Sequence, residues 1–248
     1  MSDEIVFGIH AVNNVLKRSS ERVREMYVQQ GRDDERLQEL FSLAKQNGIS
    51  VQVVKKAFLD EKAEGNHQGI ALRVKAAQVK GDNELLRQLD AMDEPAFLLI
   101  LDSITDPHNL GACLRTADAA GVHAVIAPKD KAVGITSTVS KVACGAAETI
   151  PFYQVTNLAR CLKELQDRGI WLYGTAGEAS ESVYKTDLKG PVAIVMGAEG
   201  KGLRRLTREA CDHLIHIPMK GDVSSLNVSV ATGVCLFEAL RQRSADAQ

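Results

Sequence analysis

Short apolar runs alternate with amphipathic stretches along most of the chain, and the pattern is clearest after residue 95. We predict strands there at 96–101, 123–127, 150–155, 170–175, 192–196 and 213–217. Near-continuous apolar strands that alternate with helices indicate a parallel sheet covered on both faces. The pattern therefore predicts an α/β domain over residues 95–248. Ligands of such a sheet bind beyond the carboxyl ends of its strands.

The first 76 residues also alternate between helix and strand signals, in shorter units. We predict helices at 9–18, at 33–46 and from Ala57, with strands at 25–29, 50–54 and 69–74. These elements predict a small α/β domain over residues 1–76. Residues 77–94 are polar and acidic and end at Pro95, so we interpret them as a connector with a short helix at 82–89.

The last helix is predicted to begin at Val228, and it carries apolar residues on nearly every side. This pattern predicts burial on several of its faces. Just before it, the chain from Ile217 passes through a polar turn that contains Ser225, Asn227 and, in the helix itself, Ser229. Such a cluster of hydrogen-bonding groups serves either a ligand or the cap of the helix. From this segment alone, both interpretations stay open.

Composition narrows the function only slightly. The formal net charge is −2, so an RNA-binding protein of this composition must use a local basic patch rather than a global positive field. The five cysteines are odd in number and scattered, which predicts reduced thiols and a cytoplasmic protein. No stretch approaches the length of a membrane span. His213 and His216 lie on opposite faces of a predicted strand, so we expect no metal site.

The segment Asp106-Pro-His-Asn-Leu-Gly-Ala-Cys-Leu-Arg follows the strand predicted at 96–101. Asn109 precedes an amphipathic helix, and we predict that it is the N-cap. Arg115 lies off the apolar face of this helix, which carries Leu110, Cys113, Leu114 and Ala117. Arg115 is therefore either a solvated surface arginine or a group that can reach a phosphate.

A glycine-rich segment, Val-Met-Gly-Ala-Glu-Gly-Lys-Gly-Leu, covers residues 195–203 and follows another predicted strand. Glycines let the backbone approach a ligand and permit positive φ. The segment is not a Walker A loop, because Gly202 stands where Ser or Thr is required, and its glycine spacing is the reverse of the dinucleotide fingerprint. Glu199 either contacts a ligand or caps a helix that begins near Leu203.

These three segments, in this order and at these spacings, resemble the motif set of the SpoU-type RNA ribose methyltransferases of the SPOUT superfamily. The resemblance covers residues 95–243. It implies a C-terminal domain with a deep trefoil knot whose loops enclose S-adenosylmethionine, and an L30e-like RNA-binding domain at residues 1–76. It further implies a homodimer that methylates the 2′-hydroxyl of a guanosine in the peptidyl-transferase region of 23S rRNA. The substrate would be either naked rRNA or an assembling large subunit.

The resemblance also implies roles for individual residues. Arg115 would act on the 2′-hydroxyl, either by orienting the ribose through a phosphate or by accepting the proton. The first role is favoured because arginine stays protonated at neutral pH. Gly197 would line the cofactor, and backbone groups of Ile217 and Leu226 would hold its adenine and ribose. The other residues of the implied active site are Asn109, Glu199, Ser225 and Asn227.

The N-terminal domain offers five basic residues as a candidate RNA-facing patch, namely Arg22, Arg24, Arg32, Lys55 and Lys56. Each has acidic neighbours, so a mixed solvated surface is the alternative. Two other functions stay open: a sister enzyme that acts on tRNA guanosine, and a non-catalytic RNA-binding protein. The L30e-like domain argues against the first, and the intact polar set argues against the second. A dehydrogenase is weaker still, because no dinucleotide motif is present.

Overall fold

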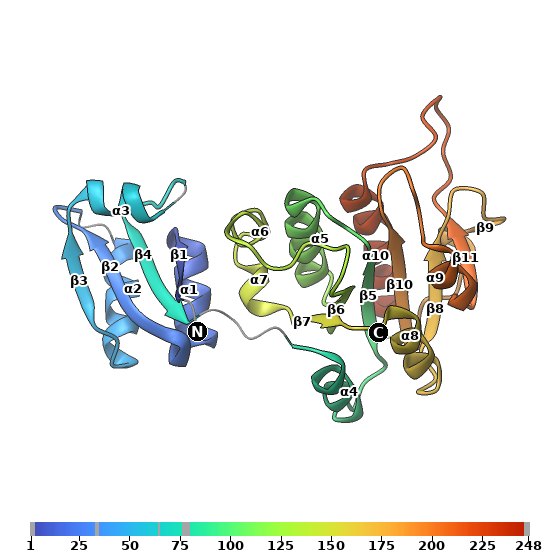
Figure 1. Ribbon diagram of the computed structural model, residues 1–248, viewed down its shortest axis with the longest axis horizontal. Helices are drawn as coiled ribbons and strands as arrows, with labels where there is room; N and C mark the ends of the chain where they lie inside the picture. Colours follow the sequence, from blue (N-terminus) through green and yellow to red (C-terminus); the bar gives the residue numbers. More distant parts are fainter. Residues whose placement is uncertain (1–2, 33–34, 64, 76–79, 246–248) are drawn as a thin grey trace. The chain divides into compact units, whose positions relative to one another are not determined.

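The computed structural model describes residues 3–32, 35–63, 65–75 and 80–245. Two predictions fall partly outside these ranges, namely the start of the helix at 33–46 and the connector residues 77–79. Contacts divide the chain into two compact units, one that joins residues up to 78 with 135–149, and one that joins 79–134 with 150–248. Each unit contains its own sheet (Figure 1).

The sheet of the first unit has the strand order β1-β4-β2-β3. Its strands are β1 (Asp3–Phe7), β2 (Val23–Gln29), β3 (Val51–Val54) and β4 (Ile70–Lys75). β4 runs antiparallel to both β1 and β2, whereas β2 and β3 are parallel. The sequence pattern missed β1, because this edge strand buries only Val6 and so shows little alternation.

Helices cover both faces of this four-stranded sheet. The covering helices are α1 (Ile9–Arg18), α2 (Glu35–Gln46) and α3 (Lys56–Lys62). Two further helices belong to this unit, α6 (Ser137–Ala143), which contacts β1, and α7 (Ala146–Thr149), which contacts α1. α1 and α2 contribute to one core cluster with Met26 and Leu72, while Leu59 of α3 packs with Tyr27 and Ala71. Neighbouring residues on β2 and β4 thus belong to opposite faces, as strand geometry requires.

The second unit contains a seven-stranded sheet of order β7-β6-β5-β10-β8-β11-β9, and every pair in it is parallel. Its strands are β5 (Phe97–Asp102), β6 (Ala124–Pro128), β7 (Phe152–Val155), β8 (Trp171–Thr175), β9 (Glu181–Ser182), β10 (Val192–Gly197) and β11 (His213–His216). The predicted parallel sheet is confirmed. The two-residue strand β9 was missed because it is too short to produce a hydrophobic pattern.

Helices cover both faces of this sheet as well, as Figure 1 shows. They are α4 (Asp82–Asp90), α5 (Pro107–Ala119), α8 (Leu158–Gln166), α9 (Arg205–Ala210) and α10 (Val228–Ala245). Leu98 and Ile100 of β5 pack with residues of α4 and α8. α5 and α10 pack against each other, and α10 also contacts β10. None of the described helices is both long enough and apolar enough to cross a membrane.

The last helix, α10, is less buried than its composition predicts. Cys235, Leu236 and Ala239 are buried, but 52% of Val230 and 49% of Phe237 are exposed. The prediction of burial on several faces is therefore only partly correct for a single chain. The reason is geometric, since contacts with α5 and β10 cover only part of the circumference of the helix.

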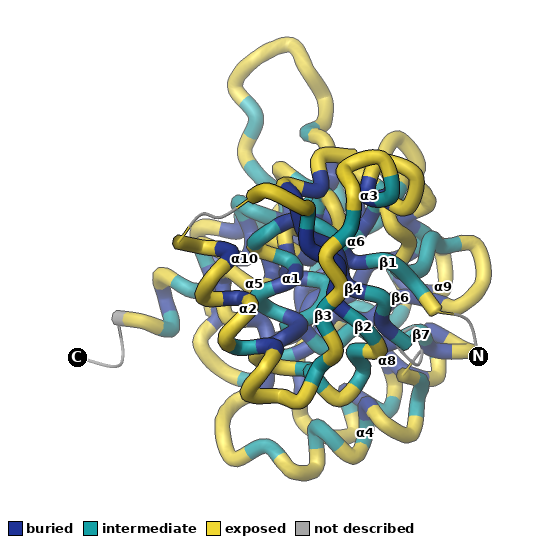
Figure 2. Tube along the Cα trace, turned by 90° about the vertical axis from the view of Figure 1, so that its left-hand side faces the viewer, coloured by how far each residue is buried: buried dark blue, intermediate teal, exposed yellow. Residues whose placement is uncertain are grey.

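The strand order determines where the polar segments meet. β10 pairs with β5 on one side and with β8 on the other, although β5 and β8 are far apart in sequence. The loops that follow β5, β10 and β11 therefore leave the same edge of the sheet. The loop of residues 217–227 projects from this edge at the top of Figure 2, and most of its length is exposed.

Candidate active site

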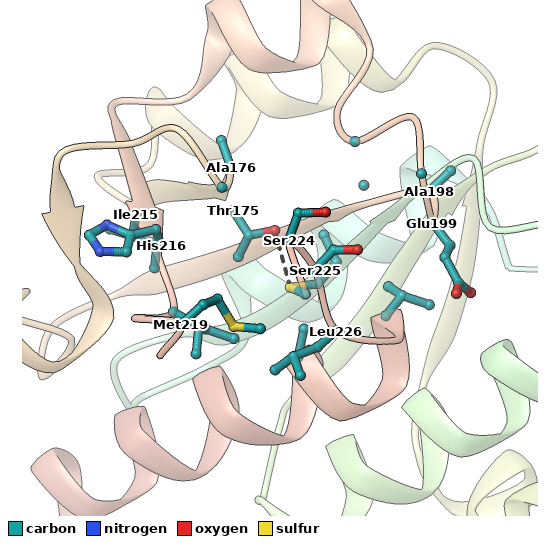
Figure 3. A pocket seen from close by; sticks show the side chains of 18 residues that line it. Thr175, Ala176, Ala198, Glu199, Ile215, His216, Met219, Ser224, Ser225 and Leu226 are labelled. Carbon is teal, nitrogen blue, oxygen red and sulfur yellow. Dashed lines mark hydrogen bonds between the residues drawn. The ribbon is translucent and has the colours of Figure 1, made fainter. Parts of the chain in front are cut away.

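A pocket of about 360 Å³ lies at the carboxyl ends of β8, β10 and β11 (Figure 3). Its lining comes from residues 175–177 at the end of β8 and from 196–200 and Gly202 around the end of β10. The rest comes from the segment that runs from the end of β11 into the first turn of α10, namely 215–217, Met219, 224–226, Val228 and Ala231. This is the edge at which a parallel sheet is expected to bind a ligand. The pocket combines apolar walls with backbone groups and a few polar side chains.

Gly197 and the loop after it form one wall of this first pocket. The loop folds back on itself, because Ala198 and Gly202 exchange backbone hydrogen bonds of 3.1 and 2.8 Å. Gly200 and Gly202 have φ of +74° and +64°, which glycine adopts without strain. A Cβ at Gly197 would lie 2.1 Å from the carbonyl carbon of Gly202. No side chain fits at residue 197 unless the loop moves, so bare backbone borders the pocket there.

Three of the predicted site residues meet at Asn227. Its Nδ2 donates to Oδ1 of Asn109 at 3.0 Å and to Oε2 of Glu199 at 3.3 Å. Its Oδ1 accepts from the backbone N of Ser229 at 2.9 Å and from the Ser229 hydroxyl at 2.6 Å. Asn227 therefore caps α10 and also joins the glycine-rich loop to α5. The two interpretations of the polar turn, helix cap and ligand site, are compatible.

The predicted N-cap of α5 is wrong. Asp106 is the cap and accepts from the backbone N of His108 at 2.9 Å, and Pro107 is the first helical residue. Proline suits this position because its φ is fixed and its missing N–H would have no partner there. Asn109 therefore lies within the first turn, where its side chain reaches Asn227. The capping alternative for Glu199 is also wrong, because α9 begins at Arg205.

Ser225, Leu226 and Ile217 line the first pocket, together with Gly197 and Glu199. Figure 3 shows Ser224 and Ser225 in the middle of this lining, with Glu199 toward one end and His216 toward the other. The sequence had therefore indicated five of the lining residues before the fold was known.

The sequence interpretation missed Thr175, His216 and Met219, which also line the pocket. The Thr175 hydroxyl donates to the backbone O of Val195 at 3.1 Å, which links β8 to β10. The Nδ1 atom of His216 is buried and has no hydrogen-bond partner among the described residues. Thr175 and His216 are the last residues of β8 and β11. Their position at strand ends is the signal that could have found them.

Arg115 was also predicted to be in the active site, but within a single chain it does not lie beside the cluster of Asn109, Glu199 and Asn227. It is exposed on α5, and it lines neither the first pocket nor the one beside it. Its place on the helix agrees with the sequence, since its neighbours Cys113, Leu114 and Ala117 are buried.

A second pocket, of about 470 Å³, lies on the other side of the glycine-rich loop. It is lined by residues 103–106, Asn109, Lys131, 198–199, 201–204 and Val228. Below it, the fully buried carboxylate of Asp102 accepts from the backbone N of Arg204 at 3.0 Å and from its Nε at 2.5 Å. This ion pair ties the end of the glycine-rich loop to the end of β5.

The side chains around the two pockets favour positioning rather than nucleophilic chemistry. Burial raises the pKa of the Cys113 thiol, between α5 and α10, to about 11, and burial raises that of Cys235 to about 12. Both thiols therefore stay protonated at neutral pH. Within the described ranges, no three His, Cys, Asp or Glu residues are grouped to hold a metal ion. Besides amides and hydroxyls, the polar groups of the two linings are the imidazole of His216 and the charged side chains of Asp106, Lys131, Glu199, Lys201 and Arg204.

The five basic candidates of the first unit do not form one patch. Arg22 ends the 3-10 turn just before β2 and Arg24 lies at the start of β2, whereas Lys55 follows the end of β3. β2 and β3 are parallel. Arg22 is paired with Glu4 at 2.8 Å. Lys56 is paired with Asp60 at 2.8 Å, and Arg32 follows β2 at the same end as Lys55.

Comparison with known proteins agrees with this geometry. Residues 96–237 match the SpoU rRNA Methylase family, and residues 5–80 match the family described as RNA 2′-O ribose methyltransferase substrate binding. The chain is 63% identical to the 23S rRNA (guanosine-2′-O-)-methyltransferase RlmB of Shewanella oneidensis, over 97% of this chain and 98% of that protein. It is 56% identical to the protein of the same name from Escherichia coli K12, over 97% and 99% of the two chains.

Solved structures show the same fold over almost the whole chain. The SpoU methyltransferase AviRb from Streptomyces viridochromogenes, in complex with the cofactor AdoMet, superposes with a TM-score of 0.83 at 23% identity. The alignment covers 98% of this chain and 91% of that one. The family match spans more than half of the chain, and relatives of high identity match it nearly end to end. The chain therefore belongs to the SpoU rRNA methylase family.

Proposed function

We propose that this protein transfers a methyl group from S-adenosylmethionine to the ribose 2′-hydroxyl of a guanosine in 23S rRNA. One observation carries the proposal: Asn227 joins Asn109 to Glu199 beside a pocket whose wall at Gly197 is bare backbone. Relatives of 63% and 56% identity over nearly the full chain are named for this reaction. The protein would act in the cytoplasm, on naked rRNA or on an assembling large subunit.

The first pocket fits S-adenosylmethionine. Gly197 presents bare backbone to the pocket, because a Cβ there would overlap the backbone of Gly202, while Ile217 and Leu226 offer backbone groups and apolar side chains to an adenine and a ribose. The buried Nδ1 of His216, which has no partner in the described part of the chain, is a polar atom that a ligand can satisfy. When bound, the cofactor supplies a methyl group on a sulfonium, which is already electrophilic.

The residues around the pocket must then position a poor nucleophile. The bonds from Asn227 fix the side chains of Asn109 and Glu199 beside the pocket, and the Ser225 hydroxyl lies on its lining. Correct positioning of two reactants can contribute about 7–11 kcal/mol to lowering a barrier. In this proposal Arg115 binds a phosphate of the target and orients the ribose, since a guanidinium remains protonated at neutral pH.

We also infer that the active form is a homodimer. Arg115 is exposed and borders neither pocket of its own chain. On α10, which packs against α5, Val230, Val234 and Phe237 repeat at helical spacing, and the first and last of them are about half exposed. A second copy would cover this apolar stripe and bring its own Arg115 to the pocket of the first copy.

We assign one function to each of the two domains expected from the sequence. Residues 1–76 would bind RNA as an L30e-like domain, and residues 95–248 would catalyse the transfer. The expected connector 77–94 is shorter than the sequence predicted, because α4 packs with β5 in the core of the second unit. The substrate-binding family match over residues 5–80 supports the first assignment. We further propose that the segment from β10 to α10 forms the deep trefoil knot of the superfamily. A crystal structure traced through residues 192–245 tests the knot.

Ribose-methylation mapping tests the function. 23S rRNA from cells that lack this protein should lose one 2′-O-methylguanosine in the peptidyl-transferase region, and a plasmid copy should restore it. Purified protein should methylate fragments of 23S rRNA and leave bulk tRNA unmodified. Methylation of tRNA instead would establish the sister activity. No calorimetric binding of S-adenosylmethionine would establish a non-catalytic RNA-binding protein.

A further inference from the structure

The second pocket shares a wall with the first. Ala198, Glu199, Gly202 and Val228 line both pockets. Glu199 is hydrogen-bonded to Asn227, which in turn holds Asn109 at the edge of the second pocket. The two pockets are therefore adjacent at this cluster. Methyl transfer needs two adjacent sites of this kind, because donor and acceptor must be held in line.

Two of the segments that line the second pocket, the loop after β6 and the glycine-rich loop, are each anchored by hydrogen bonds. The backbone N of Val133 donates to the backbone O of Ile104 at 2.8 Å, which ties the loop after β6 to the segment after β5. The bonds from Arg204 to the buried carboxylate of Asp102 anchor the glycine-rich loop on the opposite side. The opening between these two loops is thus set by bonds within the second unit.

Each loop contributes one lysine to the lining of the pocket. Lys131 follows β6 and Lys201 lies in the glycine-rich loop, and both residues are exposed. The third cation of the lining, Arg204, is already engaged with Asp102. Over the residues that the structure covers, no hydrogen bond or ion pair involves the ammonium group of Lys131 or of Lys201. Both ammonium groups are thus available to an anion at the mouth of the pocket.

We propose that the second pocket receives the target nucleotide of the RNA, and that Lys131 and Lys201 bind the phosphates that flank it. This inference rests on the proposed function and extends it to the acceptor site. A nucleotide within a strand carries a phosphate on each side, and lysines that contact phosphates fix its register. A pocket of about 470 Å³ lies within the usual range for small-molecule sites. The net charge of −2 makes such local cations necessary for binding RNA.

Two single substitutions, Lys131→Gln and Lys201→Gln, test this assignment. The measurement is the Kd for a 23S rRNA fragment that contains the target guanosine, at several salt concentrations. Each substitution should weaken binding about tenfold or more, as expected for a lost hydrogen bond to a charged group. Each should also reduce the slope of log K against log salt by about 0.7. The calorimetric Kd for S-adenosylmethionine should not change.

Lys129→Gln is the matched control. Lys129 is exposed, follows β6 in the same loop as Lys131, and does not line the pocket. The Lys129→Gln variant loses the same positive charge. It therefore measures how much RNA affinity falls from the change in net charge alone. If Lys131→Gln and Lys201→Gln bind the fragment as tightly as Lys129→Gln, with equal salt slopes, the acceptor-site assignment is overturned. If the wild-type protein instead binds the fragment but transfers no methyl group to it, the proposed function fails separately.

Discussion

At the scale of single residues, chemistry was easier to predict from the sequence than position. Ser225, Asn227 and Ser229 stood out because a turn rarely needs so many hydrogen-bonding groups. Asn109 and Glu199 were assigned to the site only through the resemblance to the SpoU-type motifs. The helix cap at Asp106 was missed, since Asp and Asn are equally good caps and only the structure shows which is used. Lys131 was not predicted either, because its relation to Lys201 depends on how two distant loops meet.

Gly197 gives the most direct residue-level prediction. In Gly197→Ala, the added Cβ would overlap the backbone of Gly202, so the loop must shift. We expect a loss of about 1–3 kcal/mol in the free energy of unfolding and at least tenfold weaker binding of S-adenosylmethionine. Urea denaturation and calorimetry measure the two effects. Gly221→Ala is the control, because a Cβ there meets nothing within 4 Å. Wild-type cofactor affinity in Gly197→Ala would refute the role of this wall.

Arg115 gives a second prediction at this scale. Lysine retains the charge of Arg115 but loses the planar fork that binds a phosphate through two parallel hydrogen bonds. Arg115→Lys should lower kcat/KM on the order of a hundredfold, or roughly 2.7 kcal/mol, while the Kd for S-adenosylmethionine stays at the wild-type value. Arg205→Lys, at an exposed arginine paired with Glu209, should behave as wild type. Near-normal turnover of Arg115→Lys would contradict the assigned role.

At the scale of elements, the apolar runs predicted six strands of the second unit and their parallel arrangement. Such runs are distinctive because helices bury both faces of the sheet. The order of the strands was not predictable, since the pairing of β10 with both β5 and β8 depends on contacts between distant segments. Strands β1 and β9 were missed for want of length or burial. The sequence therefore indicated part of the pocket lining, but it missed Thr175, His216 and Met219 and did not show which residues touch.

The pair of Asp102 and Arg204 is the element-level prediction. Asp102 is fully buried, while the Arg204 side chain is 42% exposed. The Asp102 carboxylate accepts two hydrogen bonds from Arg204, which hold the end of the glycine-rich loop, and both weaken when the carboxylate charge is lost. We expect Asp102→Asn to lower the free energy of unfolding by about 1–3 kcal/mol and to raise the KM for S-adenosylmethionine more than it lowers kcat. Urea denaturation and steady-state kinetics measure these effects.

Arg205→Gln is the matched control for Asp102→Asn. It breaks an exposed pair with Glu209 one helical turn away, which is worth about 0.3–0.5 kcal/mol. If Asp102→Asn is no more harmful than Arg205→Gln, Asp102 does not position the loop.

At the scale of the whole molecule, the exposed stripe on α10 predicts association. Phe237→Asp places a charge in the proposed interface, and burial of an unpaired charge is costly. We expect this variant to sediment as a monomer at micromolar concentration and to lose most of its methyl transfer, and we expect the wild-type protein to sediment as a dimer. Leu206→Asp, at another exposed apolar residue, on α9, should stay dimeric and active. A dimeric and active Phe237→Asp would place the interface elsewhere.

The hydrogen bonds of Asn227 couple the positions of three segments: the first turn of α5, the glycine-rich loop and the start of α10. Both hydrogens of one planar NH₂ group are used, one toward Asn109 and one toward Glu199. The separation of those two side chains is therefore set by the covalent angles of a single nitrogen atom. A substitution that displaces any one of the three segments must move the other two or break one of these bonds.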